Sequence, residues 1–176
     1  MKRLNKGLLM AMLVVMVHSG HAQQEGLTHI SFFIGTWDIE TIDRTPQGGM
    51  IKGRARSVVE YILDGKAMKD DFYGLDPAGN VIFRGTSIRS FNATTGKFQI
   101  VWIMPGITGI TDISAEWKDG KLVSTGKGYD SMGEFLERFE YYNITSDSYS
   151  FRMDRSYDGG KTWIKNFGQM HAKRVK

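Results

Sequence analysis

The sequence predicts an all-β protein, a single antiparallel up-and-down β-barrel of about ten strands with a short helix near its start. Three observations support this fold class. Most breaks between the apolar segments, such as LDGK, KDGK and YDGGK, combine Gly with Asp or Asn, which suits tight hairpin turns. No break is long enough to hold a crossover helix, so consecutive strands must pair antiparallel. An open meander would leave two sheet edges, and closure into a barrel removes them.

The expected elements follow the chain in order. The stretch LTHISFFIG, residues 27–35, has apolar residues at helical spacing and predicts one short helix. The later segments are rich in β-branched and aromatic residues and are bounded by turn signals, so they predict strands. Pro46, Pro77 and Pro105 all fall in the breaks, where a β protein tolerates Pro. The expected strands cover residues 36–45, 51–63, 67–75, 81–91, 97–104, 110–118, 121–129, 134–144, 148–157 and 162–175.

Residues 1–22 have the composition of a secretory signal peptide. Basic residues precede an apolar run over residues 7–17, and Gly20 and Ala22 supply the small side chains that a cleavage site requires. We therefore expect cleavage after Ala22, an exported protein of the periplasm or the medium, and one barrel domain over residues 23–176. The alternative is an uncleaved anchor helix, although the apolar run is about half the roughly 20 residues that span a bilayer. No membrane span is expected once the signal is removed.

Charge and residue content exclude several classes of function. The sequence has 23 basic and 19 acidic residues, but three of the basic residues lie in the signal, which leaves a net charge of +1. No basic cluster with interleaved aromatic residues is present, so we expect no nucleic-acid partner. The chain has no Cys and, after the signal, only His29 and His171. Thiol chemistry, a three-His metal site and a Cys-based zinc site are therefore excluded.

Alternation along several segments predicts which side chains face the barrel interior. In SYSFRMDRSY the apolar residues occupy odd-numbered positions, and Arg155 shares their parity. In GRARSVVEY, residues 53–61, the odd-numbered residues from Ala55 to Tyr61 are also expected to face the interior. Asp70 shares parity with the apolar residues of AMKDDFY. In FLERFEYYNI both parities hold aromatic and charged residues, so its inner face stays undecided.

The stretch FFIGTWDIE places a Gly-x-Trp on the first expected strand, directly after the short helix. It resembles the calycin superfamily, the lipocalin and fatty-acid-binding-protein type of barrel. In calycins this Trp closes one barrel end, and an Arg near the end of the last strand packs on it. The resemblance implies the first role for Trp37 and the second for Arg174. Such an indole–guanidinium contact contributes about 0.5–2 kcal/mol.

Three local features narrow the resemblance. The FFIGTWDIE opening, the ILDGKAM hairpin and the closing SYDGGKTWIKNFGQMHAKRV are similar to an uncharacterised family of exported bacterial calycin-like proteins. The likeness covers essentially all of residues 23–176. It implies a fold that often holds a small hydrophobic or amphipathic ligand, and it names no activity.

Charged residues within the expected strands are candidates for ligand binding. Arg89, Arg138 and Arg155 lie inside strongly β segments, and an inward Arg would pair with a carboxylate or phosphate of a ligand. Asp70 is the matching candidate acid, either in a salt bridge or as an acid–base group with a perturbed pKa. The alternative for the arginines is a structural ion pair or a side chain that reaches solvent.

Three further candidates for ligand contact are apolar or aromatic. Trp102 and Met104 belong to WIMPGITGI, residues 102–110, which is unusually apolar for a turn region. An exposed apolar loop of this kind marks a portal or contact surface, and the alternative is a lid folded over the barrel mouth. Tyr141 of FLERFEYYNI is the third.

His171 is the candidate for a cofactor. It is a late residue on the last expected strand, and nitrobindins, haem-binding barrels of the same broad shape, ligate haem iron through a His near the C-terminus. That more distant similarity implies haem with His171 as proximal ligand. The alternative is an exposed or hydrogen-bonded His, because His171 shares parity with Lys165 and Lys173 as well as with Phe167.

No motif selects a reaction. The chain has no nucleophile elbow, phosphate loop, zinc-protease motif or calcium loop, and we predict no catalytic residue. Calycin barrels include isomerases and cyclases, so an enzyme that acts on a metabolite between Arg155 and Asp70 is the other alternative to a binding protein.

The stretch SYDGGKTW, residues 156–163, resembles the Asp-box of sialidase-type propellers. It occurs once, and nothing repeats at the roughly 40–50-residue spacing of propeller blades. We interpret it as the last hairpin of the barrel.

Overall fold

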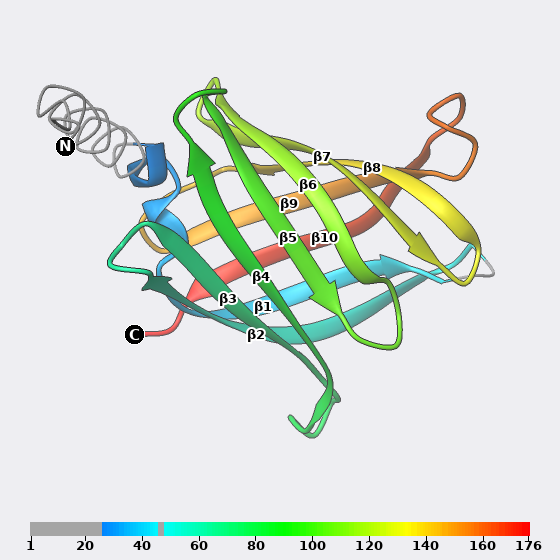
Figure 1. Cartoon of the computed structure of the whole chain (residues 1–176). Coiled ribbons are helices and arrows are strands. Elements are labelled where there is room, and N and C mark those ends of the chain that lie inside the picture. Colours follow the sequence, from blue (N-terminus) through cyan, green and yellow to red (C-terminus); the bar gives the residue numbers. More distant parts are fainter. Residues whose placement is uncertain (1–25, 46–47) are drawn as a thin grey trace, which may run out of the picture.

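The first and last strands close the sheet into a barrel (Figure 1). In the computed structural model, which describes residues 26–45 and 48–176, ten strands follow the order β1-β10-β9-β8-β7-β6-β5-β4-β3-β2 and return to β1. All neighbours pair antiparallel, including β1 with β10. The expected up-and-down barrel is confirmed. Its strands are β1 (Gly35–Arg44), β2 (Met50–Ile62), β3 (Ala67–Leu75), β4 (Val81–Asn92), β5 (Lys97–Met104), β6 (Gly109–Lys118), β7 (Lys121–Asp130), β8 (Gly133–Tyr142), β9 (Ser148–Ser156) and β10 (Ile164–Arg174).

The turn signals locate the strand ends well. Each strand begins and ends within two residues of its expected segment. The helix expected over residues 27–35 is shorter: residues 26–28 are helical, and a 3-10 turn, η1 (Ser31–Phe33), follows. β1 then begins at Gly35, where φ is +124° and a Cβ atom would lie 2.4 Å from Arg174 Nη1. Glycine tolerates both that backbone conformation and that close approach, which explains its place in FFIGTWDIE.

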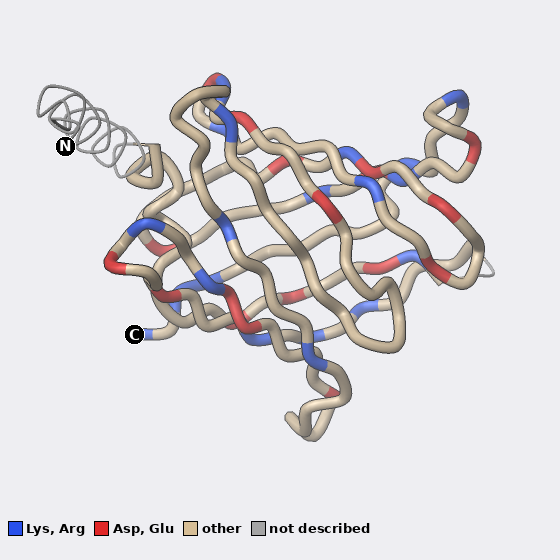
Figure 2. Tube along the Cα trace, viewed as in Figure 1, with Lys and Arg blue, Asp and Glu red and all other residues tan. Residues whose placement is uncertain are grey.

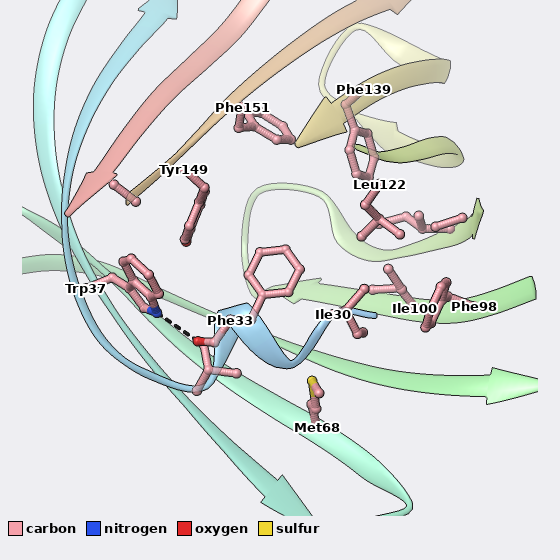
Figure 3. Packing of buried hydrophobic residues seen from close by; sticks show 14 of the residues in the cluster. Ile30, Phe33, Trp37, Met68, Phe98, Ile100, Leu122, Phe139, Tyr149 and Phe151 are labelled. Carbon is pink, nitrogen blue, oxygen red and sulfur yellow. Dashed lines mark hydrogen bonds between the residues drawn. The ribbon is translucent and has the colours of Figure 1, made fainter. Parts of the chain in front are cut away.

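Aromatic packing closes the end of the barrel beside η1 (Figure 3). Trp37 is fully buried, and its Nε1 donates a 2.7 Å hydrogen bond to the carbonyl oxygen of Phe33. The Arg174 guanidinium lies 4.2 Å from the centroid of the Trp37 ring and donates to the carbonyl oxygen of Ile34 at 2.6 Å. The contact that the calycin resemblance implies is therefore present, and it joins β1, η1 and β10.

The connections after β1, β3, β5, β7 and β9 lie at the opposite end of the barrel from η1, because consecutive strands alternate in direction (Figure 1). We call this the loop end. The β9–β10 connection there contains SYDGGKTW, whose Asp158 carboxylate accepts a 2.6 Å hydrogen bond from Thr162 Oγ1. The interpretation of that stretch as a hairpin is confirmed. Large apolar side chains are exposed at or near this end: Met50, Ile51, Val81, Ile82, Ile107, Ile110, Tyr129 and Met132.

Odd-numbered residues of β2, β8 and β9 face the interior. This confirms the parity expected for β9 and most of β2, and it fixes the inner face of β8, which the sequence left undecided. Tyr61 is an exception, since 43% of it is exposed one residue before the end of β2. Tyr61 shares the inner face with its β3 partner Met68, which is fully buried, but Tyr61 itself is not buried.

The expected signal peptide over residues 1–22 lies outside the described residues. Between residues 26 and 176, apart from 46–47, no helix has the length and hydropathy needed to cross a bilayer.

Candidate functional site

A cavity of about 230 Å³ occupies the barrel interior. Its walls come from every strand except β7, and also from Thr108 in the β5–β6 connection. One side of the cavity lies above the aromatic cluster that closes the η1 end, and we call that side its floor. The cavity extends from there toward the loop end, where Asp43, Met104 and Thr108 line it. A single interior space thus collects side chains from residues 39 to 170.

Much of the cavity wall is aromatic or aliphatic. The rings of Phe72 and Trp102 meet edge to face with centroids 5.9 Å apart. On the facing strands, Phe151 lies 5.3 Å from Phe139 and 5.0 Å from Tyr141, measured between ring centroids. Such walls favour the apolar part of a ligand through removal of surface from water.

A buried ion pair forms the floor of the cavity. Arg89 Nη2 lies 2.6 Å from Asp70 Oδ2, and the two side chains are 5% and 9% exposed. The Ser57 hydroxyl donates to the other Asp70 carboxylate oxygen, Oδ1. The Arg89 guanidinium also lies over the ring of Phe33 from η1, 4.4 Å from its centroid. The short helical segment therefore supports the floor from below.

A second charged group lies nearer the loop end. Arg155 contacts two carboxylates, with Nη1 3.0 Å from Asp130 Oδ2 and Nη2 3.1 Å from Glu137 Oε2. The Tyr157 hydroxyl donates to the same Asp130 oxygen at 2.8 Å. Only Arg155 and Glu137 of this group line the cavity itself.

Burial raises the pKa of Glu137 above its ordinary value of 4.5, although the nearby Arg155 opposes the shift. The folded protein therefore holds this proton more tightly than the unfolded chain does. A raised carboxyl pKa contributes stability below pH 4.5 that is lost as the pH rises through the folded-state pKa.

We expect the stability advantage of the wild type over Glu137→Gln to shrink as the pH rises above about 4.5. Urea unfolding of both proteins across pH 4–8 measures this difference. An advantage that grows with pH would show that the pKa of Glu137 is lowered instead.

Four buried polar atoms on the cavity wall have no hydrogen-bond partner among the described residues. They are Ser87 Oγ, Arg89 Nη1, Thr108 Oγ1 and Arg155 Nε. A buried polar group without a partner costs about 1–3 kcal/mol, so native proteins leave few of them. Their collection around one cavity leaves several polar groups there available to pair with water or a bound molecule.

The structure brings six of the candidate ligand contacts together in this cavity. They are Asp70, Arg89, Trp102, Met104, Tyr141 and Arg155. Met104 and Thr108 line the cavity while Ile107 is 55% exposed, so WIMPGITGI borders the loop end of the cavity.

Arg138 lies on the outer face of β8, so its prediction as a cavity contact needs correction. Its Nε is 3.1 Å from Asp154 Oδ2, and its guanidinium lies 4.2 Å from the centroid of Trp163. The inner face of β8 belongs to the odd-numbered residues, which puts Arg138 outside.

His171 is exposed on the outer face of β10, where Nδ1 lies 3.4 Å from Ser150 Oγ. It does not line the interior cavity. A haem bound through His171 would have to lie outside the barrel, against a depression of about 480 Å³ that His171 lines with Tyr142 and Arg54. The role of His171 as a haem ligand stays a prediction.

Ser87 and Glu137 are two polar cavity residues that the sequence did not single out. Ser87 has no distinguishing motif, although it shares parity with Arg89. Glu137 lies on the strand whose inner face the sequence left undecided. The alternation of buried residues along β4 was the only signal in the sequence that pointed to Ser87.

A larger depression of about 760 Å³ lies on the outer face of β5 to β10. Its charged side chains pair with one another, as in Lys97–Glu116 at 2.6 Å and Arg152–Glu140 at 2.7 Å. Acidic and basic residues are interspersed along the strands (Figure 2). Because these charges have partners and the lining is polar, the interior cavity is the better candidate site.

No family model matches the chain, and no curated protein matches it in sequence. Solved structures do resemble it. Rv2717c from M. tuberculosis has a TM-score of 0.61 at 12% identity, over 86% of this chain and 98% of its own. The S-type phycobiliprotein lyase CpeS from Guillardia theta has a TM-score of 0.58 at 11% identity, over 90% and 96%. This likeness shows the fold: an antiparallel barrel consistent with the calycin-like resemblance.

Proposed function

We propose that this protein is an exported barrel that binds a small hydrophobic or amphipathic molecule in its interior cavity. The observation that carries the proposal is a largely apolar cavity of about 230 Å³ whose wall holds four unpartnered buried polar atoms. Ligand sites combine apolar walls with a few polar groups that orient the ligand. Export rests on the signal-like composition of residues 1–22.

Two further observations support a binding function. A structure of similar fold is named a phycobiliprotein lyase, which is compatible with a small-molecule site in a barrel of this shape. The loop end also offers an entrance, since exposed Ile107 and Ile110 flank Thr108, which lines the cavity. Exposed apolar residues beside an opening suit the passage of an apolar molecule.

Native mass spectrometry of the protein purified from its own cells tests the proposal. We expect an added mass that disappears on denaturation and that belongs to a small organic molecule. A matched pair of variants locates it: Ile100→Trp fills the cavity, and Ile88→Trp adds the same bulk on the outer face of the same hairpin. The adduct should be lost only in Ile100→Trp. Equal occupancy in both variants would contradict binding inside the barrel.

A second candidate function is an isomerase-like or cyclase-like enzyme. The observation that favours it is a carboxyl of raised pKa, Glu137, on the cavity wall beside Arg155 and facing the same space as Asp70. A group of this kind is suited to proton transfer. Incubating the isolated ligand with the wild type and with Glu137→Gln tests it. Conversion by the wild type alone supports an enzyme, and recovery of unchanged ligand from both supports binding without reaction.

A further inference from the structure

We infer that the ligand is an uncharged molecule of about the size of one substituted ring, and that it carries a hydrogen-bond acceptor which binds Arg89 Nη1 and Ser87 Oγ at the cavity floor. This inference rests on the proposed function and narrows it. Three independent features carry it: the volume of the cavity, the kind of polar atoms on its floor, and the balance of its charges.

The volume limits the size of the ligand. An apolar cavity of about 150 Å³ accommodates benzene. The interior cavity has about 230 Å³, so it has room for one ring with a substituent of a few atoms, or for an aliphatic chain of similar bulk. Tetrapyrroles and large fused polycycles exceed this space, and a long acyl chain would have to extend out of it through the loop end.

The floor presents donors that need an acceptor. Arg89 Nη1 can only donate, and Ser87 Oγ carries a hydroxyl hydrogen that is free to do so. The two residues lie two positions apart on the inner face of β4, so their side chains point to the same side of the strand. Both are buried, at 4% and 3% exposed, and both line the cavity. An acceptor group of a ligand placed against β4 therefore faces both unpartnered atoms.

The charge balance favours an uncharged acceptor over a carboxylate. Arg89 already has a counter-ion, because Asp70 lies 2.6 Å away and is held by the Ser57 hydroxyl. Among the residues that the structure describes, Asp43, Asp70 and Glu137 line the cavity together with two guanidinium groups, those of Arg89 and Arg155. An incoming anion would lose its hydration and approach a pair that is already neutral, beside an excess of carboxylates.

Three probes with one ring each separate these features. Isothermal titration of the purified protein at pH 7 compares toluene, which has no polar group, with benzamide, whose uncharged amide offers the carbonyl acceptor together with N–H donors, and benzoate, its anionic counterpart. We expect benzamide to bind about tenfold more tightly than toluene, the gain of a hydrogen bond to a charged donor. Benzoate should bind at least about tenfold more weakly than benzamide, because its charge has no free counter-ion.

The outcomes distinguish the inference from the proposed function. Binding of benzoate as tight as that of benzamide, or of toluene as tight as that of benzamide, overturns the inference and leaves a binding barrel. Absence of binding for all three probes overturns the size limit, and native mass spectrometry then decides whether the proposed function survives it. Binding in the expected order supports both.

Ser87→Ala tests the location of the acceptor. It should weaken the binding of benzamide about threefold to tenfold, the effect of one neutral hydrogen bond, and leave the affinity for toluene unchanged. Ser114→Ala, an exposed position on the outer face of β6, is the matched control and should change neither. An unchanged benzamide affinity in Ser87→Ala would place the acceptor elsewhere and overturn this part of the inference.

Discussion

Asp70→Asn is expected to lower the free energy of unfolding by about 3–5 kcal/mol, because it leaves the buried Arg89 guanidinium without its counter-ion. Both partners of this pair lie on the floor of the cavity, and their side chains are less than 10% exposed. Urea unfolding at pH 7 measures the change, with the midpoint and the slope compared separately so that a change in the unfolded state is recognised.

Two companion variants make this result specific to the ion pair. Asp71→Asn alters the neighbouring carboxylate, which is about one third exposed and pairs with Lys69 at 3.0 Å, so it should cost much less. Asp70→Asn combined with Arg89→Met removes both charges and should recover much of the lost stability. A double variant as unstable as the sum of its parts would mean that the two residues do not act as a pair.

Trp37→Ala is expected to cost about 3–5 kcal/mol, since it empties a fully buried aromatic site at the closed end of the barrel. The variant also removes the 2.7 Å hydrogen bond to the Phe33 carbonyl and the surface on which Arg174 stacks. Thermal unfolding followed by circular dichroism gives the loss. If the variant does not fold, Trp37→Phe retains most of the apolar volume and should give a smaller loss that is measurable.

Trp163→Ala is the control for this prediction. Trp163 belongs to the β9–β10 hairpin, is only partly buried and contacts Arg138 on the outside of the barrel. Trp163→Ala should therefore lower the free energy of unfolding clearly less than Trp37→Ala does. Equal losses of unfolding free energy in the two variants would show that the packing around Trp37 and Arg174 does not stabilise the barrel more than a surface contact does.

The fold was predictable because local signals determine it. Most strands end at breaks that combine Gly with Asp or Asn, and the lack of room for a helix between strands leaves only antiparallel neighbours. The alternation in SYSFRMDRSY predicted that Arg155 lies inside, as observed. Where alternation fails, as on β8 with apolar and charged residues on both faces, the sequence could not place Glu137 inside or Arg138 outside.

The site was less predictable because its contacts join strands through their register. Asp70 lies opposite Ser87 on β4, and the Arg89 side chain reaches diagonally back to it. The strand register likewise brings Asp130 on β7 and Glu137 on β8 to Arg155 on β9. The sequence named some of these residues singly, but the closure of the barrel decides which of them share a cavity, and how large that cavity is.

Methyl NMR during a toluene titration tests the central claim, a binding cavity inside the barrel, most directly. Ile100, Ile113 and Met153 line the cavity, while Ile82 and Ile88 are exposed outside it. We predict saturable shifts of the first three methyl signals and unchanged signals for the other two. Shifts confined to the exposed isoleucines, or no saturable shift of any cavity methyl group, would contradict the account.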